Sequence, residues 1–202
     1  MSQPLRIVVF DRTQRGRRLF PGLSRIWSAG ARLYQSLDRV DERIAAGSWQ
    51  EALVRVLNLE RPIAELQVWA HGKWGDVRLG PQALELDSFQ RPSSELRQLR
   101  ERLAPGALVW FRTCETFGAH RGQAFASVAA DWLGCTVAGH THVIGYWQSG
   151  LHVLAPGAKP TWSADEGLLR GTPEHPLQAL PSTPFAPNTV TCLEGSIPAH
   201  FT

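Results

Sequence analysis

The stretches Glu65-Leu-Gln-Val-Trp-Ala-His-Gly72 and Ala107-Leu-Val-Trp-Phe-Arg-Thr-Cys114 decide the fold of this chain. Each is a short hydrophobic run that ends in a chemically reactive residue, His71 or Cys114. Largely unbroken apolar character is typical of strands in a parallel sheet that is covered on both faces. Parallel strands end at one edge of their sheet, where open α/β folds place their chemistry. The two stretches therefore predict an imidazole and a thiol at the same sheet edge.

The sequence around these two strands alternates between further strands and helices. Apolar residues recur at helical spacing between Leu23 and Leu37, and Ser48 to Glu51 forms a capping-box pattern before a second helix. Further strands are expected at residues 5–10 and 135–139. Further helices are expected at residues 93–103, ended by Pro105-Gly106, and after Gly122, ended by Gly134. This alternation predicts a three-layer α/β/α sandwich with a mostly parallel sheet.

The domain organisation is expected to change near residue 155. Eight of the 14 prolines lie in the last 47 residues, where no helical periodicity is found. We therefore expect one domain over residues 1–155 and a Pro-rich C-terminal extension over 156–202 that packs on it. Trp162 and Phe185 are candidate anchors for this tail, which is expected to modulate access to the cleft.

Composition excludes several classes of protein. A hydrophobic content of 43% with 19% charged residues is globular, and a mean hydropathy of -0.19 without a long apolar run argues against a membrane span. The N-terminus lacks the apolar stretch of a secretory signal. The cysteines, Cys114, Cys135 and Cys192, are widely spaced without a CxxC motif, which favours a reducing compartment. A cytoplasmic protein is expected.

The pairing of a cysteine with a histidine points to nucleophilic catalysis. A free thiol has a pKa of about 8.5, yet the thiolate is the nucleophile. His71 is the expected proton acceptor for Cys114. Gly72 permits close backbone approach, and its N–H together with that of Cys114 is expected to form an oxyanion hole.

These motifs resemble those of the caspase-like cysteine peptidases, in which one strand ends in His-Gly and a later strand ends in Cys. Val68-Trp-Ala-His-Gly72 and Trp110-Phe-Arg-Thr-Cys114 match in order, and residues 118–139 are similar to segments of uncharacterised bacterial caspase-like domains. The resemblance covers about residues 5–155. It implies a cysteine endopeptidase that uses a His71–Cys114 dyad and an acyl-enzyme on a protein or peptide substrate, with no cofactor.

The sequence departs from this family in two respects. Arg112 and Thr113 precede Cys114, where family members usually carry small or acidic residues. No linker for cleavage into large and small subunits is present.

Substrate selection is expected to involve charge. Caspase-like enzymes commonly draw a P1-binding charge from the loop after the first strand, where Asp11 and Arg12 are adjacent. Asp11 would select a basic P1 residue and Arg12 an acidic one. His140 and Trp162 are further candidates for substrate binding.

Two other classes of function remain open. His140 and His142 would face the same side of an extended strand, and together with His71 or Cys114 they could bind the zinc ion of a hydrolase. No HExxH motif is present, however. We therefore expect both histidines simply to line the cleft. The other alternative is a catalytically silent binding module. Residues 1–46 contain nine arginines and four acids, but lack the motifs of nucleic-acid binders. A membrane contact is not expected, and the sequence leaves the oligomeric state open.

Overall fold

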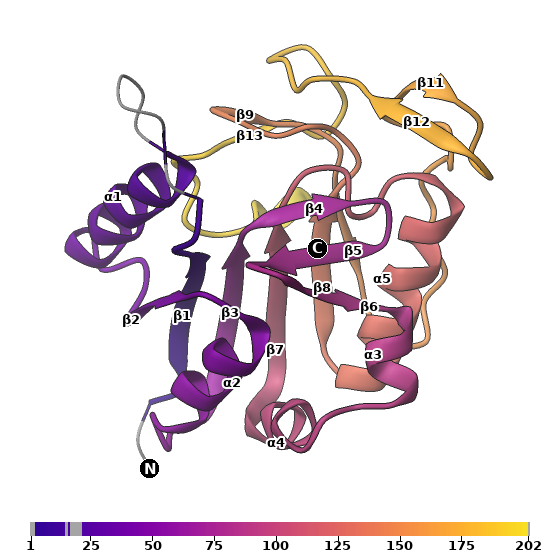
Figure 1. The fold of residues 1–202 in the computed structure, drawn as a ribbon. Coiled ribbons are helices and arrows are strands. Elements are labelled where there is room, and N and C mark those ends of the chain that lie inside the picture. Colours follow the sequence, from indigo (N-terminus) through magenta and orange to yellow (C-terminus); the bar gives the residue numbers. More distant parts are fainter. Residues whose placement is uncertain (1–2, 15, 17–21, 202) are drawn as a thin grey trace.

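A six-stranded sheet forms the centre of the computed structural model, which describes residues 3–14, 16 and 22–201 (Figure 1). The strand order is β10-β8-β7-β3-β1-β2. The parallel strands are β1 (Leu5–Asp11), β2 (Glu42–Ala46), β3 (Ile63–Trp69), β7 (Leu103–Arg112) and β8 (Thr136–His140). Only the edge strand β10 (Leu151–Leu154) is antiparallel to its neighbour. The prediction of a mostly parallel sheet is confirmed.

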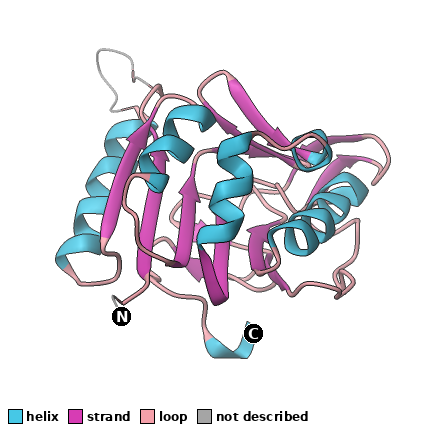
Figure 2. Cartoon of the chain, turned by 90° about the horizontal axis from the view of Figure 1, so that it is seen from below, coloured by secondary structure: helices cyan, strands magenta, loops and turns pink. Residues whose placement is uncertain are grey.

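Four helices cover one face of the sheet. They are α2 (Trp49–Leu57), α3 (Leu86–Gln90), α4 (Ser94–Arg102) and α5 (Ala119–Leu133). Their apolar sides share one buried cluster with strand residues such as Ile7, Val68 and Phe111. Figure 2 shows the helices and the sheet from below. The predicted cap of α2 is present, since the Ser48 hydroxyl accepts a hydrogen bond of 3.1 Å from the Glu51 N–H.

The opposite face is covered by a single helix and by irregular chain. Helix α1 (Leu23–Ser36) buries Ala31 and Tyr34 against Val8 and Phe10. Beside it, β13 (Val190–Thr191) pairs with β9 (Trp147–Gln148), and a 3₁₀ turn, Ala199–Phe201, follows. Val190 packs on Trp110 and Leu151. The arrangement is compatible with the predicted sandwich, with one layer completed by C-terminal chain.

Two smaller sheets lie near the carboxyl ends of the parallel strands. Strands β4 (His71–Lys73), β5 (Asp76–Leu79) and β6 (Gln82–Glu85) form an antiparallel meander. Strands β11 (Leu168–Gly171) and β12 (Pro176–Ala179) form a hairpin in the C-terminal segment.

Some expectations were wrong in detail. Strand β7 begins at Leu103, so Pro105 and Gly106 lie within a strand rather than between helix and strand. The expected anchor Phe185 is 95% exposed, whereas Trp162 is 6% exposed and belongs to the main core. Sequence pattern alone does not show which aromatic residue of a segment meets the core.

No helix in the described ranges is both long and apolar enough to cross a bilayer.

Candidate active site

Strand pairing places the two candidate catalytic residues at neighbouring points of the sheet edge. In the parallel register of β3 and β7, Trp69 lies opposite Arg112. His71 follows Trp69 by two residues, and Cys114 follows Arg112 by two residues. His71 and Cys114 therefore follow paired strand ends by the same number of residues.

Gly72 is in close contact with the loop that carries Cys114. A Cβ atom built at Gly72 would lie 2.7 Å from the Cys114 carbonyl oxygen and 2.2 Å from Thr116 Oγ1. Only a residue without a side chain fits at these distances. Gly72 was expected to let a substrate approach closely, but the atoms that approach it belong to the protein's own chain. This contact holds the His71-Gly72 segment against the Cys114 segment.

His71 is half-buried and is held from two sides. Its backbone pairs with Arg78 in the β4–β5 ladder. Its ring meets the Trp27 ring of α1 edge to face, with centroids 5.8 Å apart and an interplanar angle of 74°. These contacts restrict where the imidazole can lie.

The surroundings of Cys114 favour its thiol over its thiolate. Its Sγ donates a weak hydrogen bond of 3.9 Å to the Ile144 carbonyl. Burial raises the pKa of the Cys114 thiol, and the negative charge of Glu115 raises it further. A nucleophilic role therefore requires a base that removes the proton during the reaction.

The chain turns sharply after Cys114. Glu115 adopts a φ of 45°, in the left-handed region that costs a non-glycine residue about 1–2 kcal/mol. Its N–H donates to the His142 carbonyl at 2.9 Å and its carbonyl accepts from the Gly118 N–H at 3.0 Å. Strain held in place in this way is often found at functional sites.

The hydrogen bonding of the Cys114 N–H is a second feature of this turn. It donates to no other residue within the described part of the chain. A hydrogen bond from this N–H to the residue's own sulfur lowers the pKa of the Cys114 thiol, against the effect of burial.

Asp11 and Arg12 are engaged within the protein. The Asp11 carboxylate is fully buried and accepts hydrogen bonds from the Thr13 N–H and hydroxyl, the Gln14 amide and the Gly80 N–H. Burial opposes its ionisation, but these hydrogen bonds outweigh burial and hold the pKa of Asp11 below its usual value. Arg12 pairs with Glu51 at 2.9 Å. This geometry gives no support to a direct contact between Asp11 and a substrate.

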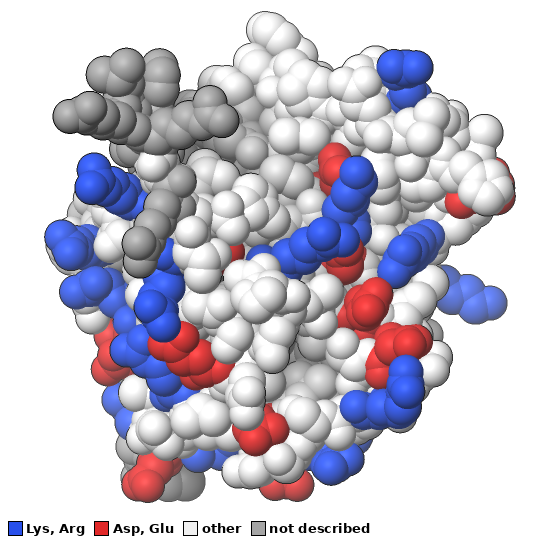
Figure 3. Space-filling view, in the orientation of Figure 1, with Lys and Arg blue, Asp and Glu red and all other residues white. Residues whose placement is uncertain are grey.

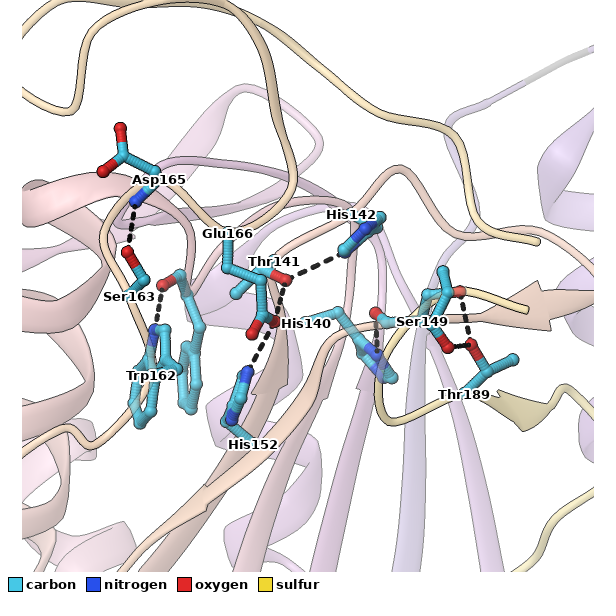
Figure 4. Close-up of polar contacts among 12 residues, drawn as sticks. His140, Thr141, His142, Ser149, His152, Trp162, Ser163, Asp165, Glu166 and Thr189 are labelled. Atoms are coloured by element: carbon cyan, nitrogen blue, oxygen red, sulfur yellow. Dashed lines mark hydrogen bonds and ion pairs between the residues drawn. The ribbon is translucent and has the colours of Figure 1, made fainter. Parts of the chain in front are cut away.

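His140 is also committed to internal hydrogen bonds (Figure 4). Because its Nδ1 faces the Ser149 carbonyl at 3.2 Å, Nδ1 carries the hydrogen, and Nε2 accepts from Trp110 Nε1 at 3.3 Å. Burial, followed by the charge of Arg112, lowers the pKa of His140 to about 3. Neither nitrogen of this neutral ring is free to bind a metal.

The described residues contain no group of three or more His, Cys, Asp or Glu side chains placed to hold a metal ion. His142 hydrogen-bonds through Nδ1 to Thr141 Oγ1 at 2.9 Å. The geometry therefore does not support the zinc-hydrolase alternative.

Trp162 lies beneath the turn that follows Cys114. Its ring is stacked between Phe117, at 5.7 Å, and His152, at 4.5 Å. Its Nε1 donates to the Phe117 carbonyl at 3.0 Å. With 6% exposure, Trp162 supports the turn from the core side and offers little surface to a substrate.

The role of Arg112 was not found by sequence reasoning. Its guanidinium is buried, lies 4.2 Å from the Trp110 ring centroid, and donates to Tyr34 Oη at 2.7 Å and to Gln148 Oε1 at 2.8 Å. A further bond of 2.9 Å reaches the Glu194 carbonyl. An arginine at the end of an otherwise apolar strand was the available signal. Beneath the site, the charged Arg112 side chain holds Tyr34, Gln148 and the Glu194 carbonyl together through these hydrogen bonds.

A hollow of about 460 Å³ lies elsewhere, between α2, β6 and α4. Trp49, Leu53, Leu84 and Leu96 contribute to its lining, and none of the candidate site residues does. This hollow is separate from the sheet edge that carries His71 and Cys114.

The fold and site together define an α/β protein with a histidine and a cysteine at the carboxyl edge of a mostly parallel sheet. The family described as Domain of unknown function (DUF4347) matches residues 43–152, which is more than half of the chain, and the protein belongs to this family. The match includes His71, Gly72 and Cys114 but not Asp11 or Trp162. No curated protein matches the sequence.

Proposed function

We propose that this protein is a caspase-like cysteine endopeptidase, with Cys114 as nucleophile and His71 as general base. The observation that supports it most is the backbone contact at Gly72, which holds the His71 and Cys114 segments together at the sheet edge. This arrangement agrees with the order of motifs in the caspase-like family. The protein substrate would lie across this edge.

In the proposed reaction, His71 accepts the Sγ proton as sulfur attacks the scissile carbonyl carbon. The N–H groups of Cys114 and Gly72 stabilise the oxyanion that forms on the carbonyl oxygen. The protonated His71 then donates its proton to the leaving amine, and the C–N bond breaks to leave a thioester. Water, deprotonated by His71, hydrolyses the thioester and releases Cys114 as the thiol.

The experiment measures cleavage of a fluorescently labelled casein and alkylation of Cys114 by iodoacetamide, followed by peptide mapping. We expect Cys114→Ala and His71→Ala each to remove nearly all turnover. When two residues act as one catalytic unit, replacing either of them removes most of the rate that the pair provides. Cys192→Ala is the matched control, since Cys192 is also a free and partly exposed cysteine. Proteolysis that survives Cys114→Ala and is lost in Cys192→Ala would show the assignment to be wrong.

A catalytically silent binding module is the second candidate. It is favoured by the burial and raised pKa of Cys114, which both oppose thiolate formation. Alkylation of Cys114 that is no faster than that of free cysteine, together with an absence of proteolysis, would support this candidate over the peptidase. Activity that is abolished by a chelator would instead support a metal-dependent hydrolase.

A further inference from the structure

Helix α1 exposes a line of large apolar side chains that the fold leaves uncovered. Leu23 is 40% exposed, Ile26 54%, Leu33 42% and Leu37, the residue after the helix, 51%. Their spacing of three, seven and four residues places them along one side of the helix, over a length of about 21 Å. We call these four residues the α1 ridge. The inner face of the helix, with Ala31 and Tyr34, is already packed on the sheet.

Positive charge runs alongside the α1 ridge. Arg25 and Arg32 lie seven residues apart on α1, about 100° around the helix from Ile26 and Leu33, and α1 contains no acidic residue. Arg39 follows the helix, lies over the Tyr34 ring and donates to the Leu193 carbonyl. Within the described ranges, neither Arg25 nor Arg32 forms an ion pair. Figure 3 shows basic side chains along the outer side of the molecule that carries α1. The surface combines an apolar line with two arginines, Arg25 and Arg32, whose charges are not paired by any acid of the described residues.

We propose that the α1 ridge is a docking surface for an amphipathic helix of another protein, apolar on one side and rich in Asp and Glu along the adjoining side. Side chains in a single row fit the groove between rows of a partner helix, and seven-residue intervals are those of paired helices. Acidic residues on the partner would complement Arg25 and Arg32. Binding at this surface requires no catalysis by Cys114.

Two other occupants fit the surface less well. A helix that lies in a lipid interface buries a broad apolar face, whereas the broad face of α1 is already used by the sheet and only a narrow row remains. A second copy of the chain would bring arginines against arginines if the two α1 helices paired, because α1 has no acid to offer. Neither objection applies to an acidic amphipathic helix of another protein.

The position of α1 links this surface to the candidate active site. Trp27, on the same helix, contacts the His71 ring. A protein held on the α1 ridge is therefore held beside the sheet edge that carries His71 and Cys114. If the peptidase proposal is correct, the ridge would recruit a protein substrate outside the cleavage site.

The test measures fluorescence anisotropy of a labelled 21-residue helical peptide with Leu at the a and d heptad positions and Glu at the e and g positions. We expect it to bind the full chain, with an affinity that falls as salt rises. The same peptide with Lys in place of Glu should bind at least tenfold more weakly. Ile26→Glu and Arg25→Glu should each weaken binding of the Glu peptide at least tenfold.

Matched controls lie on other helices. Val54→Glu on α2 and Arg97→Glu on α4 alter exposed residues of the same kind and should leave binding unchanged. Cys114→Ala should also bind normally, which separates this proposal from the proposed activity. Equal binding of the Glu and Lys peptides, no binding of either, a dimer that Ile26→Glu disrupts, or binding only to phosphatidylserine vesicles would each overturn the proposal.

Discussion

At the scale of single residues, Gly72 shows how tightly the candidate site is assembled. A Cβ atom at this position would also lie 2.8 Å from Thr113 Cβ, in addition to its contacts with Cys114 and Thr116. The Cys114 oxygen is a backbone atom and the Thr113 atom is a Cβ, so no side-chain rotation relieves the overlap. The His71 and Cys114 segments can remain in contact only while residue 72 is glycine.

We therefore expect Gly72→Ala to destabilise the protein by about 1–3 kcal/mol, the usual cost of forcing extra atoms into a packed site. Urea unfolding measures the change, and alkylation of Cys114 should show a changed rate because the turn must move. Gly145→Ala is the control, since a Cβ there meets nothing within 4 Å and its effect should stay within about 0.5 kcal/mol. Equal stabilities for the two variants would contradict this account of the contact.

At the scale of elements, a half-buried carboxylate, that of Glu166, holds the segment that leads into β11 against the sheet. Glu166 Oε1 lies 2.6 Å from His152 Nε2 on β10 and accepts from Thr141 Oγ1 at 2.8 Å (Figure 4). Burial opposes ionisation of Glu166, but its hydrogen bonds and ion pair with His152 outweigh burial and lower its pKa. Glu166 thus joins the loop after β8 to the C-terminal segment, in addition to the backbone hydrogen bonds of Val143 with Leu180 and Ser182.

The lowered pKa predicts how stability depends on pH. Because the folded-state pKa of Glu166 lies below its unfolded value, its contribution is complete above about pH 4.5 and is lost as pH falls through the folded value. Glu166→Gln should flatten the decline of the free energy of unfolding below about pH 5. Asp165→Asn, at an exposed neighbouring position, is the control for removing a carboxylate from this segment. Urea titrations between pH 3 and 7 test this, and an unchanged slope in Glu166→Gln would be the contrary result.

At the scale of the whole molecule, the C-terminal 47 residues complete the core. Trp162 belongs to the main hydrophobic cluster, Val190 packs over Trp110, and the carbonyl of Glu194 binds the buried Arg112. A chain that ended near Leu154 would expose Trp110 and leave Arg112 without part of its hydrogen bonding. Buried charge that loses its partners is strongly destabilising.

Substituting the two aromatic residues of this segment tests the point without truncation. Trp162→Ala should cost about 3–5 kcal/mol in the free energy of unfolding, because a large core side chain is removed. Phe185→Ala should change it by less than about 0.5 kcal/mol, since Phe185 is 95% exposed. Chemical denaturation measures both. Similar values for the two would mean that the segment contributes little to the core.

The sequence by itself determined the longer strands and helices of this protein and the strand ends at which its candidate catalytic residues lie. Apolar runs predicted the strands that end near His71 and Cys114, and helical spacing and the Ser48 cap predicted α1 and α2, because these signals depend on residues close together in the chain. Pattern did not reveal the five-residue strand β2 or the five-residue helix α3, which are too short to show a period.

Only the tertiary structure decided how the polar side chains around the site are used. Arg112 bonds Tyr34, 78 residues away, and Trp162 bonds the carbonyl of Phe117, 45 residues away. Asp11 and His140 have side-chain chemistry suited to binding a substrate or a metal, but burial and hydrogen bonds from distant segments occupy them instead. Such partners depend on which chain segments meet in space, and that is set by the packing of the whole molecule rather than by local pattern.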